Sequence, residues 1–397
     1  MAMASLSSAN TQFCLDLFRK LNEVNPSGNV FISPLSISAA LAMVYLGAKG
    51  QTATQMAKAL CFSQATNVHS SFTELNSDIN KPAASYLLKL ANRLYGEKTF
   101  NFLQEFLEST KKFYHADLVP VDFICASGEA RQQVNQWVEE QTEDHKYTLF
   151  SHKQCFLFIG KIKDLLKPGT VNNMTRLALV NAIYFKGSWM HKFEEKNTKE
   201  MPFKINKNES KPVMMMYRMK KFPFNYVPEL NLKILELPYV GEELSMFILL
   251  PEDISDSSTG LEKLEKELTL EKMQEWTKRE NMDTGTDILV HLPKFKLQDD
   301  YELSSALAGL GMVDVFDSSR ADLSGMNGGP GLSLSAVVHK SFIEVNEEGT
   351  EAAAATAGIV AFCMLREEHF MADHPFLFFI RHNKSNSILF FGRFSSP

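Results

Sequence analysis

Cysteine is scarce and poorly placed for cross-linking in this 397-residue chain. Only five cysteines occur, their number is odd, and none belongs to a CxxC pair. They are Cys14, Cys61, Cys125, Cys155 and Cys363. Disulfide frameworks use an even number of cysteines and zinc sites use closely spaced ones, so the sequence predicts free thiols in a reducing compartment.

Long hydrophobic runs and blocks of positive charge are also missing. No segment approaches the roughly 20 apolar residues that a membrane-spanning helix needs. The first ten residues lack the cationic start and the apolar stretch of a secretory signal. The net charge is −6, and no basic block exists that would predict a nucleic acid or a membrane as partner. We expect a cytoplasmic protein, whose release from the cell would use no signal peptide.

Signature motifs of common enzymes are absent too. The sequence contains no HExxH, GxSxG, Walker A or GxGxxG pattern. His339 lies two residues before Ser341, but this separation does not place an imidazole base on the hydroxyl, so a hydrogen-bonded structural histidine is expected. The methionines at 214–216 and 219 carry soft sulfur ligands, but flexible core packing is the simpler role. We expect no enzyme activity, no metal and no cofactor.

The composition that remains is ordinary for a globular protein, with 45% hydrophobic and 22% charged residues. No Pro/Gly/Ser-rich linker divides the chain, so we expect a single domain over residues 1–397. Helical periodicity dominates the first two hundred residues, and strand signals dominate after about residue 176. Helices are predicted at 36–49, 103–114, 126–143 and 261–276, and strands at 177–185, 234–239, 244–250, 376–381 and 388–394. This order of elements predicts an α+β fold.

Two segments interrupt these patterns. Residues 144–159 have no helical period, and residues 347–361 contain six alanines but almost no bulky side chain. Alanine favours a helix, but Gly349 and Gly358 disfavour one, and no apolar stripe would dock it on the core. As a strand, the second segment would present one row of small, uncharged side chains that can enter a packed sheet without overpacking it. The residues of this row are Thr350, Ala352, Ala354 and Thr356.

Several stretches resemble segments of the serpin family. The sequence EEGTEAAAAT at 347–356 is similar to the hinge of inhibitory serpins, and NVFISPLSI at 29–37 is similar to the segment that opens helix B of the family. Further similarities lie at 179–189, 339–346, 373–380 and 391–394. The missing signal peptide and the Ser396-Pro397 ending resemble those of the ovalbumin-like, intracellular branch. The resemblance implies the serpin fold, with a mixed central β-sheet A, two further sheets, about nine helices and an exposed reactive-centre loop.

The resemblance also implies a mechanism of protease inhibition. A serpin offers its reactive-centre loop, here within 347–370, as a substrate, and the protease forms an acyl-enzyme at the scissile bond. The freed loop then inserts into sheet A as a new strand and distorts the protease. The native state would therefore be kinetically trapped. The expected function is that of a serine protease inhibitor, acting as a suicide substrate on elastase-like and chymotrypsin-like enzymes.

The scissile bond follows from the resemblance by counting. The hinge threonine of the family is the fourteenth residue before the cut, so Thr350 places the cut between Cys363 and Met364. Cysteine suits an elastase-like primary pocket, whereas a shift by one residue presents Phe362 to a chymotrypsin-like pocket, and Leu365 follows the bond. The expected partners are elastase, cathepsin G, proteinase 3 and chymotrypsin-like proteases, each in a covalent complex with a monomeric inhibitor.

The resemblance assigns structural roles to residues outside the bond. The hinge comprises Glu347, Gly349, Thr350, Ala352, Ala354 and Thr356. The shutter, where sheet A opens, comprises Ser33, Ser36, Asn181 and His339. Trp189 falls at the breach, where the loop first enters the sheet. Because buried polar groups are normally paired, the shutter side chains are expected to be hydrogen-bonded, and none of these residues is expected to be catalytic.

The segment at 144–159 departs from the family pattern. In this branch the residues up to 143 run directly into residue 160, whereas this chain has the extra segment after the family's helix F. A longer surface loop costs little entropy, which favours a tolerated insertion. Beside the part of sheet A that must open, the same segment would instead interfere with loop insertion. The alternative function is therefore a non-inhibitory serpin-fold protein that binds partners or is simply cleaved as a substrate.

Overall fold

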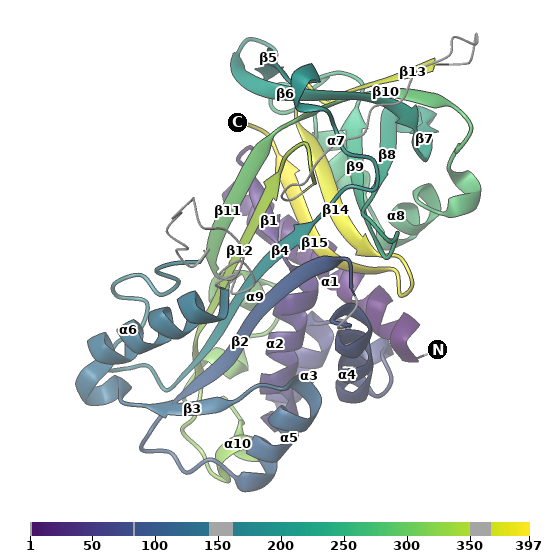
Figure 1. Cartoon of the computed structure of the whole chain (residues 1–397). Helices are drawn as coiled ribbons and strands as arrows, with labels where there is room; N and C mark the ends of the chain where they lie inside the picture. Colours follow the sequence, from purple (N-terminus) through teal and green to yellow (C-terminus); the bar gives the residue numbers. More distant parts are fainter. Residues whose placement is uncertain (1, 82–83, 143–161, 350–366) are drawn as a thin grey trace, which may run out of the picture.

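The structure, a computed structural model, describes residues 2–81, 84–142, 162–349 and 367–397. Within these ranges three β-sheets and their helices pack into one elongated body (Figure 1). The described residues form ten α-helices, where about nine were expected. They are α1 (Ala2–Val24), α2 (Pro34–Gly47), α3 (Gly50–Ala59), α4 (Val68–Ile79), α5 (Gln104–Tyr114), α6 (Phe123–Thr142), α7 (Glu262–Glu267), α8 (Leu270–Trp276), α9 (Ser304–Gly309) and α10 (Ser324–Asn327).

Sheet A is the five-stranded sheet, with the strand order β11-β12-β4-β2-β3. Its strands are β2 (Tyr86–Glu97), β3 (Leu118–Val121), β4 (Leu177–Gly187), β11 (Phe295–Glu302) and β12 (Leu334–Val345). β12 is parallel to β4 and β3 is parallel to β2, whereas the other neighbours are antiparallel. The sheet is therefore mixed, which confirms the predicted character of sheet A.

Two further sheets complete the expected set of three. Sheet B is antiparallel and consists, in spatial order, of β1 (Val30–Ile32), β15 (Ser387–Phe394), β14 (Phe376–His382), β9 (Leu244–Pro251), β8 (Leu232–Pro238) and β7 (Phe224–Val227). Sheet C consists of β13 (Glu367–Met371), β10 (Asp287–Pro293), β6 (Ser210–Lys221) and β5 (Lys199–Lys204), and it lies at the upper end of the molecule in Figure 1. The strand pairs predicted around 234–250 and 376–394 are the hairpins β8–β9 and β14–β15.

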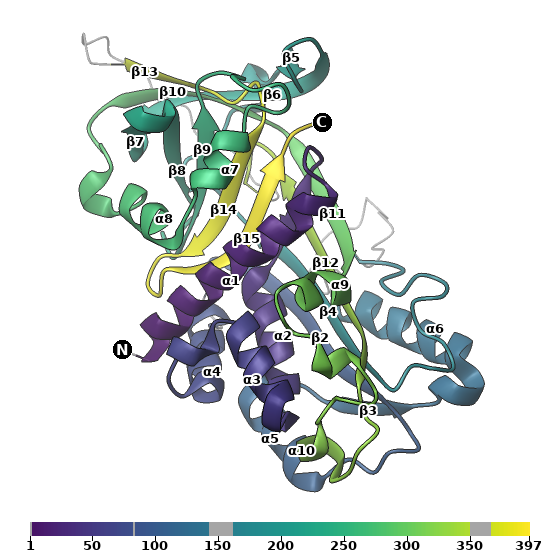
Figure 2. The same ribbon diagram turned by 180° about the vertical axis from the view of Figure 1, so that it is seen from behind.

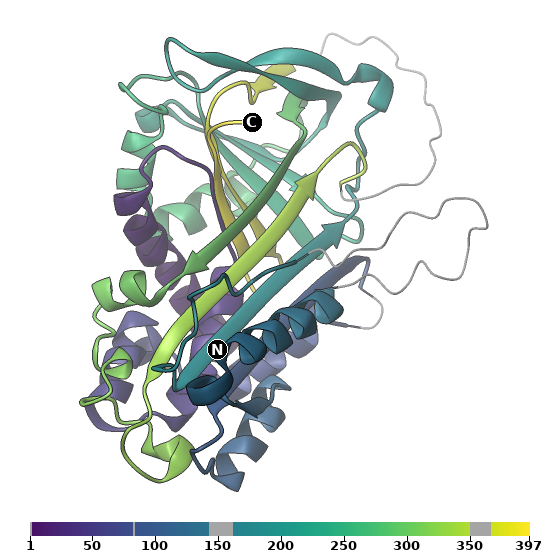
Figure 3. The same cartoon turned by 90° about the vertical axis from the view of Figure 1, so that its left-hand side faces the viewer.

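Helices cover both faces of sheet A. Figure 3 shows α6, coloured blue, lying across one face, and α2 packs against the opposite face of β2 and β4. α2 is apolar on nearly every side and is therefore almost entirely buried. β4 is buried at each position except Lys186, which confirms the prediction of a strand covered on both faces.

One prediction of secondary structure was wrong, and one central strand was missed. The helix predicted at 261–276 is interrupted, because Thr269 adopts an extended backbone conformation and its hydroxyl accepts a hydrogen bond from Lys272 N (3.2 Å), which begins α8 as a new helix. The strand β2 was not predicted at all. Its two faces are both covered, so its sequence lacks the alternation of polar and apolar residues by which a half-exposed strand is recognised.

The predicted core role of the methionines on β6 is right for two of the four. Met215 and Met216 are buried, but Met214 and Met219 are 45% and 37% exposed. Met214 lies between buried Val213 and Met215 and points to the other face, because a strand presents alternate residues to opposite faces, whereas Met219 lies near the exposed end of β6.

Cys14, Cys61 and Cys125, the cysteines in the described ranges, are free thiols. Among the helices of those same ranges, none carries an apolar stretch long enough to cross a bilayer.

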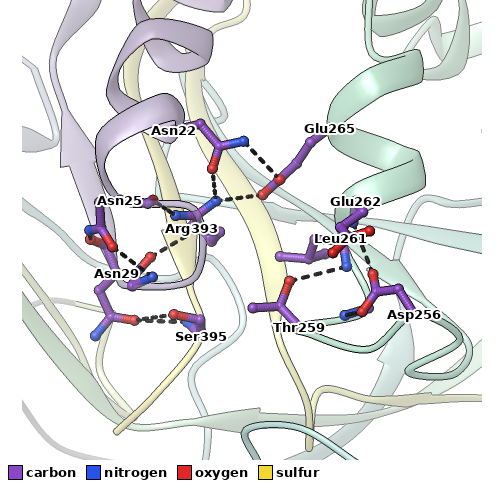
Figure 4. A network of polar contacts seen from close by, with 12 residues as sticks. Asn22, Asn25, Asn29, Asp256, Thr259, Leu261, Glu262, Glu265, Arg393 and Ser395 are labelled. Carbon is purple, nitrogen blue, oxygen red and sulfur yellow. Dashed lines mark hydrogen bonds and ion pairs between the residues drawn. The ribbon is translucent and has the colours of Figure 1, made fainter.

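A buried arginine connects the last strand of the chain to the first helix (Figure 4). Figure 2, which views the molecule from behind, shows α1 crossing sheet B beside β15. Arg393 on β15 is fully buried, and its guanidinium forms an ion pair with Glu265 of α7 at 2.8 Å. The same group donates to the Asn22 side chain at the end of α1 and to the main-chain oxygen of Gly28 (2.8 Å). These contacts stabilise the junction of α1, α7 and sheet B.

Candidate functional site in sheet A

The centre of sheet A contains a buried hydrogen-bond cluster. His339 of β12 and Asn181 of β4 are register partners in the parallel pair, and His339 Nδ1 donates to Asn181 Oδ1 at 2.6 Å. The Ser33 main-chain N–H donates to His339 Nε2 at 3.1 Å. Because Nε2 accepts this bond, the imidazole is neutral and carries its proton on Nδ1. The cluster therefore connects both central strands to the start of α2.

Two serines extend this cluster to α2 and sheet B. Asn181 Nδ2 donates to Ser36 Oγ at 2.6 Å, and Ser33 Oγ donates to the Leu389 main-chain oxygen of β15 at 2.7 Å. Ser33 is also the N-cap residue of α2 and accepts from Ser36 N. The structure thus brings together the four residues predicted for the shutter, all buried and all hydrogen-bonded.

His339 is a structural histidine, as the sequence predicted. Burial lowers its pKa to about 3. Ser341, the hydroxyl considered beside it, donates instead to the Phe31 main-chain oxygen at 2.7 Å. The two side chains therefore form no nucleophile–base pair.

Trp189 connects the end of β4 to the residues that follow β12. Its indole Nε1 donates to the Asn346 main-chain oxygen at 3.0 Å, and its own main-chain N–H donates to the Glu348 oxygen at 2.9 Å. Its ring stacks on Tyr239, with 4.6 Å between the ring centroids. The buried tryptophan fixes the position at which the chain leaves sheet A.

Glu347, the first residue of the predicted hinge, makes two side-chain contacts. Its Oε1 accepts from Thr198 Oγ1 at 2.8 Å, and its Oε2 pairs with Lys294 Nζ at 2.9 Å. Burial raises the pKa of this carboxyl, but hydrogen bonds from Lys294, from the main chain and from Thr198 outweigh that effect, so the pKa is lowered overall. Glu348 forms a further ion pair with Lys192. Sequence reasoning missed these partners, because no local pattern relates them to the hinge.

Gly349 occupies a position that only glycine fits. Its φ is +103°, and a Cβ atom there would lie 2.4 Å from Trp189 N and 2.6 Å from the Gly187 oxygen. A side chain would therefore meet rigid backbone in a conformation that is already unfavourable for L-residues. The backbone of Gly349 is therefore packed directly against the end of β4.

The parallel pairing of β4 and β12 stops before either strand ends. In the described structure their ladder extends from Leu334↔Leu177 to Phe342↔Tyr184, whereas β12 continues to Val345 and β4 continues to Gly187. Beyond these pairs the chain that follows β12 still contacts the chain that follows β4. Trp189 N donates to the Glu348 main-chain oxygen at 2.9 Å, and Gly349 forms an antiparallel bridge with Ser188.

The remaining predicted site residues lie outside the described ranges. They are the hinge residues Thr350, Ala352, Ala354 and Thr356, and Phe362, Cys363, Met364 and Leu365 around the bond. The extra segment 144–159 also lies outside them. The residues flanking that segment are described: the Ile162 N–H donates to Thr142 Oγ1 at 3.4 Å, so the chain returns to the end of α6.

Comparisons with known proteins give one consistent result. Residues 8–397 match the family described as Serpin (serine protease inhibitor). The chain is 60% identical to a leukocyte elastase inhibitor of Homo sapiens and 60% identical to one of Xenopus laevis, in each case over 396 residues and 100% of both chains. Among solved structures, maspin matches with a TM-score of 0.89 at 39% identity, covering 100% of both chains. Uncleaved ovalbumin matches with a TM-score of 0.87 at 39% identity, covering 99% of this chain and 100% of its own.

The serpin resemblance, the three sheets and the full-length similarity to inhibitors of this type agree with one another. We conclude that the chain belongs to the serpin family of serine protease inhibitors, rather than to any family of enzymes.

Proposed function

We propose that this serpin inhibits elastase-like and chymotrypsin-like serine proteases as a suicide substrate, with Cys363–Met364 as its reactive bond. The observation that carries this proposal is that the chain after β12 turns back at Gly349, which forms an antiparallel bridge with Ser188 at the end of β4. A loop attached there needs only to fold back between these strands to extend sheet A. The relatives named leukocyte elastase inhibitor support elastase as a target class.

The proposed reaction divides between the protease and the serpin. The catalytic serine of the protease attacks the carbonyl carbon of Cys363, the amide bond breaks, and the amine of Met364 leaves with a proton, which gives an ester between the protease and Cys363. Insertion then begins at Gly349, with Thr350, Ala352, Ala354 and Thr356 facing into the sheet. Those four side chains are small and uncharged, so their burial requires little repacking and no desolvation of charge.

The shutter cluster sets part of the barrier to insertion. A strand that enters between β4 and β12 must break the bond between His339 Nδ1 and Asn181 Oδ1, which joins these strands at 2.6 Å. The contacts of Glu347 with Lys294 and Thr198 oppose opening at the top of the sheet in the same way. The uncleaved protein thus stays in its native form until cleavage frees the loop.

The alternative is a serpin that no longer inhibits and acts as a binding protein or a plain substrate, because of the segment at 144–159. The contact between Ile162 N and Thr142 Oγ1 favours inhibition, because the segment starts and ends at one place on α6. Arg131 and Asn135 of α6 also donate to the Leu166 main-chain oxygen, at 3.1 and 3.0 Å. The chain on both sides of the segment is therefore well ordered against the same helix.

The partners and location proposed for the protein follow from the same mechanism. We propose elastase, cathepsin G, proteinase 3 and chymotrypsin-like enzymes as partners, with Phe362 as the alternative residue before the cut for the chymotrypsin-like ones. A monomer with free thiols suits the cytoplasm.

The test is to mix the protein with neutrophil elastase and, separately, with chymotrypsin, and to analyse the products by denaturing gel and mass spectrometry. A covalent complex with the loop cut after Cys363 or Phe362 is the expected result. Cleavage at the same bond with no covalent complex would contradict inhibition. The matched deletion variant lacks residues 144–159, and recovery of the complex in that variant alone would support the alternative function.

A further inference from the structure

Two cationic side chains of β6 lie on the side of sheet C that faces the body of the molecule. Arg218 is opposite Val290 of β10 in the antiparallel register. Lys220 is opposite Ile288, and both residues of β10 are fully buried. Directly opposed residues of neighbouring strands point to the same side of a sheet. Burial decreases toward the end of β6, where Arg218 is half-buried and Lys220 is exposed, so a ligand can approach both cations from solvent.

The guanidinium of Arg218 uses little of its capacity for hydrogen bonds. Its Nη1 donates to the Lys192 main-chain oxygen, but its Nε is buried and has no hydrogen-bond partner among the residues that the structure describes. Burial lowers the pKa of this group, and the carboxylate of Glu194 offsets that effect only in part. An arginine presents five N–H donors in a planar fork that matches the oxygens of an oxyanion. Arg218 therefore retains donors for a ligand.

Lys220 and His191 lie beside this guanidinium. His191 packs edge-on against Phe222, which follows Lys220 by two residues, with 5.9 Å between the ring centroids. Burial lowers the pKa of His191, and the positive charges of Lys220 and Arg218 lower it further, whereas Glu242 has the smallest effect and raises it. The imidazole is therefore neutral at pH 7 and has one N–H to donate. We refer to Arg218, Lys220 and His191 as the Arg218 cluster.

The nearest acids are paired with cations outside the Arg218 cluster. Glu194 pairs with Lys196 at 2.6 Å, and Glu348 pairs with Lys192. Within residues 2–81, 84–142, 162–349 and 367–397, no acid forms an ion pair with Lys220 or with the guanidinium beside it. Two positive charges therefore remain without a close counter-charge, and one of them is partly removed from water. Such a charge is unfavourable unless a partner of opposite sign is supplied.

We propose that the Arg218 cluster is a binding site for a single phosphate-type oxyanion. The free N–H groups of Arg218, the ammonium of Lys220 and the N–H of His191 are its donors. Guanidinium and ammonium groups form short, charge-assisted hydrogen bonds with phosphate oxygens. One arginine and one lysine suit one anionic group, whereas a polymer needs a row of cations to neutralise its successive charges. Free phosphate and a phosphate monoester share this chemistry.

The site is connected to the start of the hinge by main-chain contacts. Arg218 donates to the main-chain oxygen of Lys192, whose ammonium pairs with Glu348. The neighbouring Phe193 N–H donates to the Glu347 main-chain oxygen at 2.8 Å. A ligand that binds only the native protein stabilises it by mass action. Occupation of the site therefore stabilises the native contacts of the hinge together with those of the cluster.

The experiment measures phosphate binding to the full chain by isothermal titration calorimetry at constant ionic strength. Inorganic phosphate and phosphoserine, a phosphate monoester, are the two probes. Arg218→Gln removes the guanidinium and Lys220→Gln removes the ammonium. Lys221→Gln is the matched control, because Lys221 is also exposed and is adjacent on β6 but points to the opposite side. We expect Arg218→Gln to weaken binding about tenfold, Lys220→Gln about threefold and Lys221→Gln less than about 1.5-fold.

Equal affinities of wild type, Arg218→Gln and Lys220→Gln would overturn the proposal, and so would no binding to wild type at up to about 50 mM of either probe. Tighter binding of phosphoserine would support the site as one for a phosphate group on a larger molecule, and tighter binding of inorganic phosphate would support it as one for the free ion. Lys220 is exposed, so Lys220→Gln keeps the comparison possible if Arg218→Gln fails to fold. Phosphate should also raise the thermal midpoint of wild type more than that of Lys220→Gln.

Discussion

His339 and Asn181 join β12 to β4 through a single side-chain hydrogen bond, with His339 Nδ1 2.6 Å from Asn181 Oδ1. The bond crosses the boundary along which the proposed insertion divides sheet A. It needs the proton on Nδ1, and this tautomer of the neutral ring is fixed because Nε2 accepts from Ser33 N. The chemistry of one buried ring therefore affects how readily the sheet opens.

The first prediction concerns pH. Burial lowers the pKa of His339 to about 3 from its ordinary value of 6.5, so between these values the unfolded chain binds a proton that the native protein does not. Stability due to this group is complete above pH 6.5 and decreases as the pH falls toward 3, by up to about 1.4 kcal/mol per pH unit. The free energy of unfolding in urea should fall about 2 kcal/mol more between about pH 7.5 and pH 5 for wild type than for His339→Gln. Parallel pH profiles of the two proteins would contradict this.

The second prediction concerns the carboxylate of Glu347. Glu347→Gln keeps the shape of the side chain but removes the charge that pairs with Lys294 at 2.9 Å. Because the Glu347 side chain is only 10% exposed, although Lys294 is 37% exposed, we expect a loss of about 1 kcal/mol and a lower thermal midpoint. Glu344→Gln is the control, since Glu344 pairs with Lys296 at 3.2 Å on the more exposed surface of β11 and β12, where a change below about 0.5 kcal/mol is expected. Equal midpoints for the two variants would show that the Glu347 pair has no special role.

The third prediction separates steric conflict from backbone strain. Gly349→Ala introduces a Cβ atom 2.4 Å from Trp189 N at a φ of +103°, whereas Gly311→Ala introduces one with no neighbour within 4 Å at a φ of +99°. Both variants lose about 1 kcal/mol to the backbone conformation, and only the first must displace the end of β4. Thermal unfolding should therefore show the larger loss for Gly349→Ala, and an equal loss would mean that the close contact relaxes freely.

The fourth prediction tests insertion itself. Thr350→Arg places a charge in the row of side chains that would enter sheet A, and burial of an unpaired charge is unfavourable by several kcal/mol. We expect this variant to be cut at the same bond as wild type but to form no covalent complex on a denaturing gel. Glu351→Arg changes the adjacent residue, which faces outward in the proposed strand, and should still trap the protease. Covalent complexes with both variants would contradict the prediction that Thr350 faces into sheet A after insertion.

The fifth prediction concerns the buried ion pair shown in Figure 4. Arg393→Met leaves Glu265 buried without its partner, and breaking a buried pair from one side costs about 3–5 kcal/mol. Adding Glu265→Gln to this variant removes the uncompensated charge and should restore part of the loss. Chemical denaturation measures both values, and a double variant no more stable than Arg393→Met would show that the charge of Glu265 is not the cause.

Sequence patterns predicted those parts of the molecule whose signals are local. The dense apolar run of β4 and the two hairpins of sheet B are strong patterns, and they were found with small errors at their ends. The strand β2 escaped detection because burial on both faces removes its alternation. The break between α7 and α8 depends on one capping residue, Thr269, and a single threonine is a weak signal for the start of a helix in a sequence.

The candidate site was predictable for a different reason. Ser33, Asn181 and His339 were chosen through family resemblance, and the structure brings them within hydrogen-bond distance of one another in pairs. Lys294 and Thr198 were missed, because pairing between distant charged and polar residues follows from the folded chain and leaves no periodic trace.

Because Ile162 N donates to Thr142 Oγ1, the chain between these two residues can change in length without moving the residues on either side of it. A fluorescent reporter placed there would add a loop without displacing its attachment points, and the entropy of closing that loop grows only slowly with its length. The attachment points lie at the end of α6, the helix that covers one face of sheet A, and this sheet would widen when a new strand enters it. With one dye of a donor–acceptor pair at this position, capture of a protease would be measured as a change in energy transfer between the dyes.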